Sequence, residues 1–252
     1  MGGWVMRNYS IVLLICIGIS HVSLAQQTEE IYVIADGRLP SAATDQSYWL
    51  NHPAILQSSS QSREYWLRHN AVYEEDFRIM DSAQGNFTRS ASEQTAVLYL
   101  LSLWPRCCSN MGLAIVENQQ LVRNIVFAGG THHLFPVADI NDDGLDELAL
   151  VSSFGMGGSN ETSLSVISLA NDSTILKGRF PLIQNNCATM SERSERNFFR
   201  ISFDKTAPDQ FSLEQYQTGC DDVQDNEKAT SVTSIPVEAV EINDDYIDLP
   251  IN

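Results

Sequence analysis

Apolar and polar side chains alternate with a period of two along much of the chain after residue 75, which predicts β-strands rather than helices. A hairpin is expected where two apolar segments, 112–116 and 121–128, flank a short polar turn. The other strands are expected at residues 95–103, 148–154, 164–169, 174–180, 199–203 and 211–213. The pattern therefore predicts a mainly β, antiparallel fold.

The segments on either side of this region have a different texture. Residues 26–75 place large apolar residues around Pro53 and a run of serines at 58–60, so one or two short helices, interrupted at these points, are expected. Residues 221–252 are acidic and polar, with one edge strand expected at 234–242. The predicted organisation is a mixed, partly helical segment over 26–75, a β-repeat domain over 76–220 and an acidic tail over 221–252.

Residues 1–25 have the features of a secretory signal peptide. Arg7 gives a basic start, residues 11–19 are nearly all apolar, and small residues at 23 and 25 precede a cleavage site before Gln26. The apolar run is shorter than the roughly 20 residues that cross a bilayer, and no second long apolar stretch follows. Ile15 is larger than the residue that a lipid-anchored Cys16 needs before it, which favours simple cleavage. We therefore expect a secreted or periplasmic protein without membrane insertion.

Acidic residues outnumber basic ones, since 32 Asp and Glu against 15 Lys and Arg give a formal net charge of −17. Such a charge repels nucleic acid and anionic membranes, because their phosphate groups attract basic rather than acidic proteins. The charge therefore disfavours a nucleic-acid partner and suits a protein that binds cations.

Four cysteines follow the predicted signal peptide: Cys107, Cys108, Cys187 and Cys220. An even number in an exported chain favours disulfides, and four cysteines allow three pairings. Because a bond between adjacent cysteines closes a strained ring, we expect either a Cys187–Cys220 bond or bonds from these two cysteines back to the 107/108 pair. The sequence lacks the C-x-x-C spacing of zinc sites, which disfavours zinc.

Oxygen-bearing side chains alternate in the stretch ADINDDGLDELALV, residues 138–151. Asp139, Asn141 and Asp143 stand at positions 1, 3 and 5 of a turn, so that alternate side chains point toward its centre. Gly144 follows, where a sharp turn disfavours a Cβ. Calcium takes six to eight oxygen ligands at about 2.3–2.6 Å, so this pattern indicates a Ca²⁺ site.

The remaining ligands are expected just beyond the glycine. Leu145 would offer its backbone carbonyl and Glu147 its carboxylate. The other two acids, Asp142 and Asp146, should face solvent. An EF-hand would need a bidentate acid at position 12, where Leu150 stands, and flanking helices rather than strands. An ordinary acidic turn that caps a strand without an ion remains the alternative.

This loop resembles the calcium loops of FG-GAP and VCBS-type repeats, which occur in integrin α-subunit propellers and in many secreted bacterial proteins. Their pattern is D-x-N-x-D-G-x-x-D followed by an apolar strand, and about a dozen residues here match it. Two positions depart from it: Glu147 replaces the usual last Asp, and Val-Ser-Ser at 151–153 replaces the usual Gly-Ala-Pro. The resemblance implies one structural Ca²⁺ and antiparallel sheets like β-propeller blades.

A weaker copy of the same pattern precedes this loop. The stretch GNFTRSASEQTAVL, residues 85–98, aligns with 138–151, and both run into an apolar strand. The matched positions are Asn86 with Asp139, Phe87 with Ile140, Glu93 with Asp146, and Ala96 with Ala149. The offset from position 86 to position 139 is 53 residues, close to the roughly 40–50 of propeller blades. Closed propellers need four to eight blades, so two copies predict an incomplete or diverged propeller, with chance similarity as the alternative.

No catalytic residues are predicted. His132 and His133 are adjacent, so on a strand they face opposite sides and do not share one metal. Ser152 and Ser153 lack the Gly-x-Ser-x-Gly surroundings of a hydrolase nucleophile. The sequence thus favours a non-enzymatic binding module for an unidentified protein or glycan. An extracytoplasmic hydrolase that uses the acidic stretch with His132 or His133, and a structural accessory subunit, remain alternatives.

Overall fold

A computed structural model describes residues 31–39, 46–69, 75–103, 109–189, 194–207, 210–220, 228–242 and 245–251. The predicted signal peptide, Cys107 and Cys108 lie outside these residues. The described chain is mainly β, with antiparallel sheets and one α-helix, as the alternating pattern predicts. None of the helices in these ranges is long and apolar enough to cross a bilayer.

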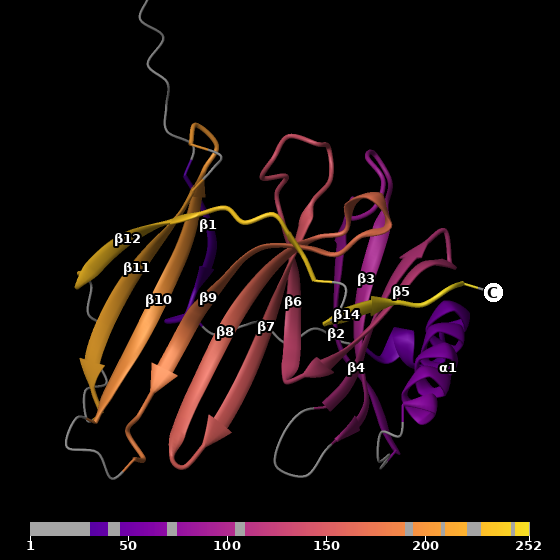
Figure 1. Ribbon diagram of the computed structural model, residues 1–252, viewed down its shortest axis with the longest axis horizontal. Helices are drawn as coiled ribbons and strands as arrows, with labels where there is room; N and C mark the ends of the chain where they lie inside the picture. The colour runs from indigo at the N-terminus through magenta and orange to yellow at the C-terminus, as the bar shows by residue number, and fades with distance from the viewer. Residues whose placement is uncertain are drawn as a thin grey trace, which may run out of the picture.

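The smaller sheet has five strands in the order β14-β5-β4-β3-β2 (Figure 1). Its strands are β2 (Glu75–Gly85), β3 (Gln94–Leu103), β4 (Ser109–Glu117), β5 (Gln120–Gly129) and β14 (Tyr246–Asp248). The 3₁₀-helix η1 (Ser47–Asn51) leads into helix α1 (Pro53–Arg68). Helix α1 lies beyond this sheet, at the end of the molecule away from the larger sheet (Figure 1).

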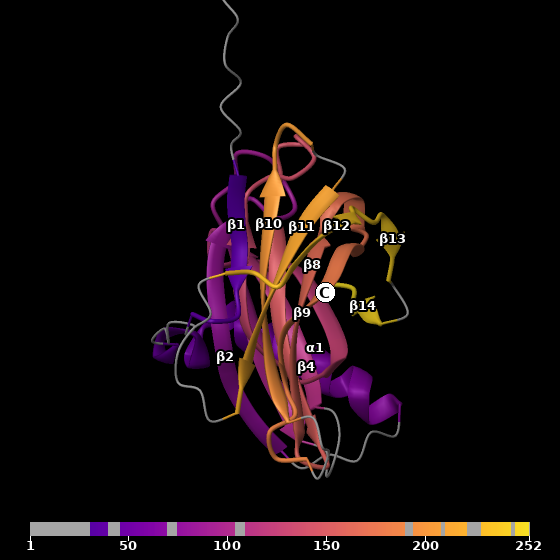
Figure 2. The ribbon, with the colours of Figure 1, turned by 90° about the vertical axis from the view of Figure 1, so that its left-hand side faces the viewer.

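The larger sheet has nine strands, seven of them in the order β12-β11-β10-β9-β8-β7-β6. These seven are β6 (Thr131–Val137), β7 (Glu147–Met156), β8 (Ser159–Ser168), β9 (Ile175–Asn185), β10 (Glu195–Asp204), β11 (Gln210–Gly219) and β12 (Ser231–Pro236). The strand β1 (Ile31–Asp36) runs alongside β10, as Figure 2 shows, and β13 (Val240–Glu241) pairs with β9. A 3₁₀-helix, η2 (Ala170–Asp172), links β8 to β9.

Both faces of β3 are buried, which explains its unbroken apolar run. Leu98 and Leu100 belong to a core between the two sheets. Val97, Tyr99 and Leu101 belong to a second core on the opposite face, under α1. A third core covers the other face of the nine-stranded sheet. A strand that is covered on both sides reads as a continuous apolar segment rather than an alternating one.

Helix α1 begins at Pro53, which separates it from η1 as the sequence predicts, and it continues through the serine run, where the second expected interruption is not present. Proline is tolerated at a first helical position, because the N–H it lacks would have no partner there. Ser58 and Ser62 make buried hydrogen bonds with the Tyr99 hydroxyl at 2.7 and 2.8 Å. Ser58 also donates to Asn124 Oδ1 at 2.8 Å. The serines therefore attach the helix to the five-stranded sheet.

Strands β2–β5 and β6–β9 form two successive antiparallel meanders, and their first strands, β2 and β6, contact each other. Asp81 of β2 links them, because its carboxylate accepts the Leu134 N–H of β6 at 3.0 Å. The side chain of Leu134 belongs to the core between the two sheets, so this junction borders that core. The described strands make up the two sheets and no closed ring.

Two links hold the C-terminal half in place. A Cys187–Cys220 disulfide, with its Cα atoms 5.5 Å apart, joins the chain just after β9 and β11 and is one of the pairings expected from the sequence. The buried Arg123 of β5 contacts both carboxylate oxygens of Asp248 in β14, at 2.7 and 2.8 Å. Where the sequence predicts one edge strand at 234–242, the structure has three short strands, β12, β13 and β14.

Candidate functional site

The acidic stretch forms the connection between β6 and β7, and its first acid organises the turn. Asp139 Oδ1 accepts the backbone N–H groups of Asn141 and Asp143, each at 3.2 Å. Asp139 Oδ2 accepts the N–H of Gly144 at 2.7 Å. Gly144 has φ +83°, a conformation that disfavours other residues. This one carboxylate therefore folds the loop back on itself.

The next two predicted ligands lie in the same turn. Asn141 Nδ2 donates to Asp143 Oδ2 at 2.9 Å, and Asp143 Oδ1 accepts the Leu145 N–H at 2.9 Å. Asp142 is exposed, as predicted, with φ +56°, but Asn141 and Asp143 are exposed as well and are not turned into an enclosed centre. With the side chains in this arrangement, no three His, Cys, Asp or Glu groups among the described residues are placed to hold a metal ion. The carboxylates of Asp139 and Asp143 instead accept N–H groups of the turn.

Glu147, the first residue of β7, is fully buried, with 0% of its surface exposed. Its Oε2 accepts the N–H of Ile140 at 2.9 Å, whereas Oε1 has no hydrogen-bond partner among the described residues. Burial raises the pKa of Glu147 to about 7, against the opposing effects of the Ile140 N–H and Lys177, and the nearby charges of Asp143 and Asp139 raise it further. A buried carboxylate oxygen without a partner is costly unless a proton or a cation reaches it.

The acidic loop packs against the turn between β2 and β3, which is the stretch that aligns with it in sequence. Asp146 and Asn86 exchange two bonds: Asp146 N–H donates to the Asn86 carbonyl at 2.9 Å, and Asn86 N–H donates to Asp146 Oδ2 at 2.8 Å. A Cβ on Gly144 would lie 2.8 Å from Ser90 Oγ. The loop thus contacts the neighbouring sheet. The sequence predicts that Asp146 faces solvent. This prediction is wrong in part, because Asp146 is half-buried in the contact with Asn86.

Gln94 of β3 stands where Glu147 stands in β7, a correspondence that sequence reasoning missed. Each is the first residue of its strand and is buried, with Gln94 1% exposed. Gln94 Oε1 accepts the Phe87 N–H at 3.0 Å, as Glu147 Oε2 accepts that of Ile140. The amide nitrogen of Gln94 donates to Thr88 Oγ1 at 2.8 Å and to Glu117 Oε2 at 3.1 Å. The alignment of 85–98 with 138–151 already contains the signal, because both side chains follow the Asn or Asp by eight residues.

The two histidines lie at the other end of β6 from the acidic loop. The Nδ1 atom of His133 contacts the carboxylate of the buried Asp81, and His132 is exposed. From His133 to the end of β6 at Val137 are four extended residues, about 13 Å of strand. The structure therefore does not bring His133 and the acidic loop together. Asp81 and His133 are more than 50 residues apart in the sequence, so no local pattern predicts that they make contact.

Compared with protein-family models, with curated proteins and with solved structures, the chain shows no match.

Proposed function

We propose that the protein is an exported calcium-binding β-repeat protein, a non-enzymatic binding module with one structural Ca²⁺ in the loop between β6 and β7. The observation that carries the proposal is the fully buried Glu147 Oε1, which has no hydrogen-bond partner among the described residues and lies near two other acids. A cation placed there would satisfy this oxygen and offset the mutual repulsion of three carboxylates.

The donor set fits calcium. The ligands would be side-chain oxygens of Asp139, Asn141, Asp143 and Glu147 and the backbone carbonyl of Leu145. All are oxygen donors, which hard cations such as Ca²⁺ prefer over the sulfur and nitrogen donors that zinc accepts. The Asn141 amide would have to turn so that its oxygen, rather than the nitrogen that now donates to Asp143, faces the ion.

The ion would stabilise the junction of the two meanders. The loop contacts the β2–β3 turn through the Asp146–Asn86 pair of hydrogen bonds, so a rigid loop holds the two sheets in register. The equivalent position in the β2–β3 turn carries the neutral Gln94, whose polar atoms have their own partners. In this proposal the two meanders are blade-like repeats, of which only the second uses an ion.

Export is supported by two independent features. Residues 1–25 have the pattern of a signal peptide, and the Cys187–Cys220 disulfide suits an oxidising, extracytoplasmic compartment. The test is to extract the protein under alkylating conditions and ask whether the Cys187–Cys220 bond is present. Its presence would support an oxidising compartment.

The test of calcium binding is titration calorimetry combined with thermal melting, in Ca²⁺, in Mg²⁺ and in chelator. Calcium should release or absorb heat and raise the melting temperature, with a Kd on the order of 0.1–1 mM as in other extracellular modules. Asp143→Asn should abolish both effects. Asp142→Asn is the matched control, because it removes the same charge from an exposed neighbour in the same loop. No heat and no change in melting temperature would disprove the proposal.

A further inference from the structure

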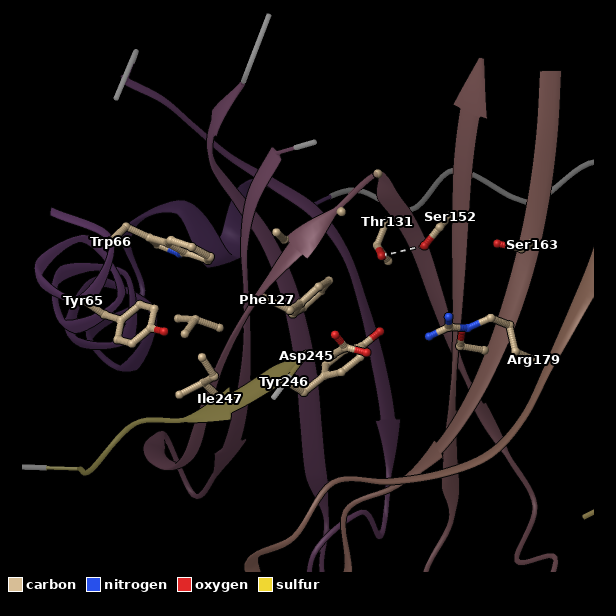
Figure 3. Close-up of a pocket in the computed structure, with 15 residues that line it drawn as sticks. Tyr65, Trp66, Phe127, Thr131, Ser152, Ser163, Arg179, Asp245, Tyr246 and Ile247 are labelled. Carbon is tan, nitrogen blue, oxygen red and sulfur yellow. Dashed lines mark hydrogen bonds between the residues drawn. The ribbon is translucent and has the colours of Figure 1, made fainter. Parts of the chain in front are cut away.

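A cavity of about 540 Å³ opens between the two sheets, beside the core that joins them. One wall is aromatic and includes Tyr65 of α1, Phe127 of β5 and Tyr246 of β14. The opposite wall is polar and includes Ser163 and Ser165 of β8 and Arg179 of β9. Figure 3 shows these walls on opposite sides of the cavity, which we call the inter-sheet groove.

The polar wall lies on the side of its sheet that faces the core. Leu150 of β7 belongs to the core between the sheets. Ser165 pairs with Leu150 across the ladder, and Arg179 pairs with Ser165. Paired residues share one face of a sheet, so a row that begins with a buried leucine continues with a hydroxyl and a guanidinium. Arg179 is exposed, so this row runs from the core at Leu150 to a solvent-accessible guanidinium at β9, which a ligand in the groove can reach.

The inter-sheet groove carries one charge of each sign. Arg179 and Asp245 both line it, and neither side chain forms a hydrogen bond or ion pair with another described residue. Figure 3 shows the Arg179 guanidinium directed toward Asp245 and Tyr246. Burial is the main cause that raises the pKa of Tyr246 to about 12, while Arg179 opposes this rise and Asp245 adds to it. The Tyr246 phenol therefore interacts electrostatically with both charged side chains.

These features restrict the ligand. Because the net charge of the chain is −17 and the groove contains one cation and one anion, a strongly anionic ligand is repelled and a neutral one is not. The groove offers an aromatic surface with the Asp245 carboxylate beside it on one side, and hydroxyls and a guanidinium on the other. A sugar ring has the matching surfaces, since its C–H face is apolar and its rim carries hydroxyls that both donate and accept.

We propose that the inter-sheet groove binds a neutral sugar of one or two rings, with the ring face on the aromatic wall and the hydroxyls on Arg179, Asp245 and the serines. This inference names the ligand of the binding function proposed above and does not depend on calcium. Arg179 and Asp245 would each bind two neighbouring hydroxyls, the bidentate geometry that both side chains favour.

The experiment measures binding of a panel of neutral sugars to the full-length protein by calorimetry and by saturation-transfer NMR. The panel contains the methyl glycosides of glucose, galactose, mannose and N-acetylglucosamine, and the disaccharides maltose, cellobiose and lactose. At least one sugar should bind. Arg179→Ala and Tyr65→Ala should each weaken it by about tenfold or more, the effect of losing one charged hydrogen bond or one stacking surface.

Two matched controls exist on the surface. Arg78→Ala removes an arginine that pairs with Asp76 and does not line the groove. Tyr48→Ala removes a tyrosine that is 65% exposed and lies outside the groove. Neither should change sugar affinity. Ser163→Leu fills the groove without removing a charge and should also abolish binding. It tests the groove independently in case Arg179→Ala or Tyr65→Ala fails to fold.

Free tryptophan is titrated beside the panel as a zwitterion. Three results would overturn the inference: no sugar of the panel binds, Arg179→Ala and Tyr65→Ala bind as the unaltered protein does, or tryptophan binds the groove and no sugar does. The last result would assign the paired charges to a zwitterion instead. All titrations are repeated in chelator, so that sugar binding without any calcium effect separates this inference from the calcium proposal.

Discussion

Replacing Glu147 by glutamine tests the acidic loop most sharply, because the two side chains have the same shape and differ in charge. Burial raises the pKa of Glu147 from 4.5 to about 7. Each pKa unit corresponds to about 1.4 kcal/mol, so the ionised side chain destabilises the calcium-free fold by about 3 kcal/mol. Glutamine removes this cost, and its amide oxygen still accepts the Ile140 N–H. The variant should therefore be more stable than the wild-type protein in chelator.

The size of this gain depends on pH in a defined direction. Below pH 4.5, Glu147 is protonated in the folded and the unfolded chain, so its burial as an ion costs nothing. Between pH 4.5 and about 7 the unfolded chain releases the proton first, and the folded state loses stability as the pH rises. Above about pH 7 the full cost remains. Calcium-free Glu147→Gln should gain nothing near the acid limit and up to about 3 kcal/mol in mild alkali.

Calcium should act in the opposite direction. At about 10 mM Ca²⁺ and a Kd on the order of 0.1–1 mM, binding adds about 1–3 kcal/mol to the stability of the wild-type protein. The variant lacks the buried anionic ligand and should gain much less. The advantage that Glu147→Gln has in chelator should thus shrink or reverse when calcium is added.

The assay is urea unfolding followed by tryptophan fluorescence, in chelator and in calcium, with Asp142→Asn as the control for a lost charge at an exposed position. A variant that is less stable than the wild-type protein in chelator at mild alkaline pH would refute the reasoning from burial. A variant that keeps the whole calcium increment would show that Glu147 is not a ligand.

Three further substitutions test other parts of the fold. Gly112→Ala should destabilise by about 3 kcal/mol in thermal melts, since its Cβ would lie 2.1 Å from the Tyr99 ring, and a loss below about 1 kcal/mol would contradict this packing. Replacing Cys187 and Cys220 by alanine opens a loop with a sequence separation of 33 and should cost about 3–4 kcal/mol in urea unfolding, a loss that reductant reproduces in the wild-type protein only. Asp81→Ala leaves two backbone N–H groups without their acceptor and should cost about 3 kcal/mol, whereas an unchanged unfolding midpoint would show that the carboxylate does not join β2 to β6.

Local pattern was enough to predict strands β3–β5 and β7–β11 and the acidic turn, but it did not predict β1, β2 or β6. The segment expected at 95–103 is β3 within one residue, and the expected hairpin is formed by β4 and β5. Asp139, Asn141 and Asp143 meet in one turn, because alternation and a following glycine are properties of neighbouring residues. Such signals lie within a dozen residues of each other.

The features that the sequence did not predict depend on partners far along the chain. The serine run of α1 looks like a break, until Tyr99 and Asn124 of the adjoining sheet supply its hydrogen bonds. The C-terminal strands look like a loose acidic tail, until Arg123 binds Asp248, 125 positions away. Hydroxyl and carboxylate groups are ambiguous in sequence, because the same residue favours solvent or core according to whether a partner reaches it.

The two aligned turns, between β2 and β3 and between β6 and β7, differ in one buried side chain, which has all its polar partners in the first turn and, among the described residues, lacks one in the second. At the first position of β3, the Gln94 amide has one atom that accepts and one that donates, and both find partners inside the turn. At the first position of β7, Glu147 has two atoms that can only accept when ionised, and among the described residues a single N–H reaches them. The backbone bond to the residue after Asn or Asp is the same in both, so the turn itself does not require the acid. What the acid adds is an unsatisfied negative oxygen next to two more carboxylates, and this is the feature that a bound cation would explain.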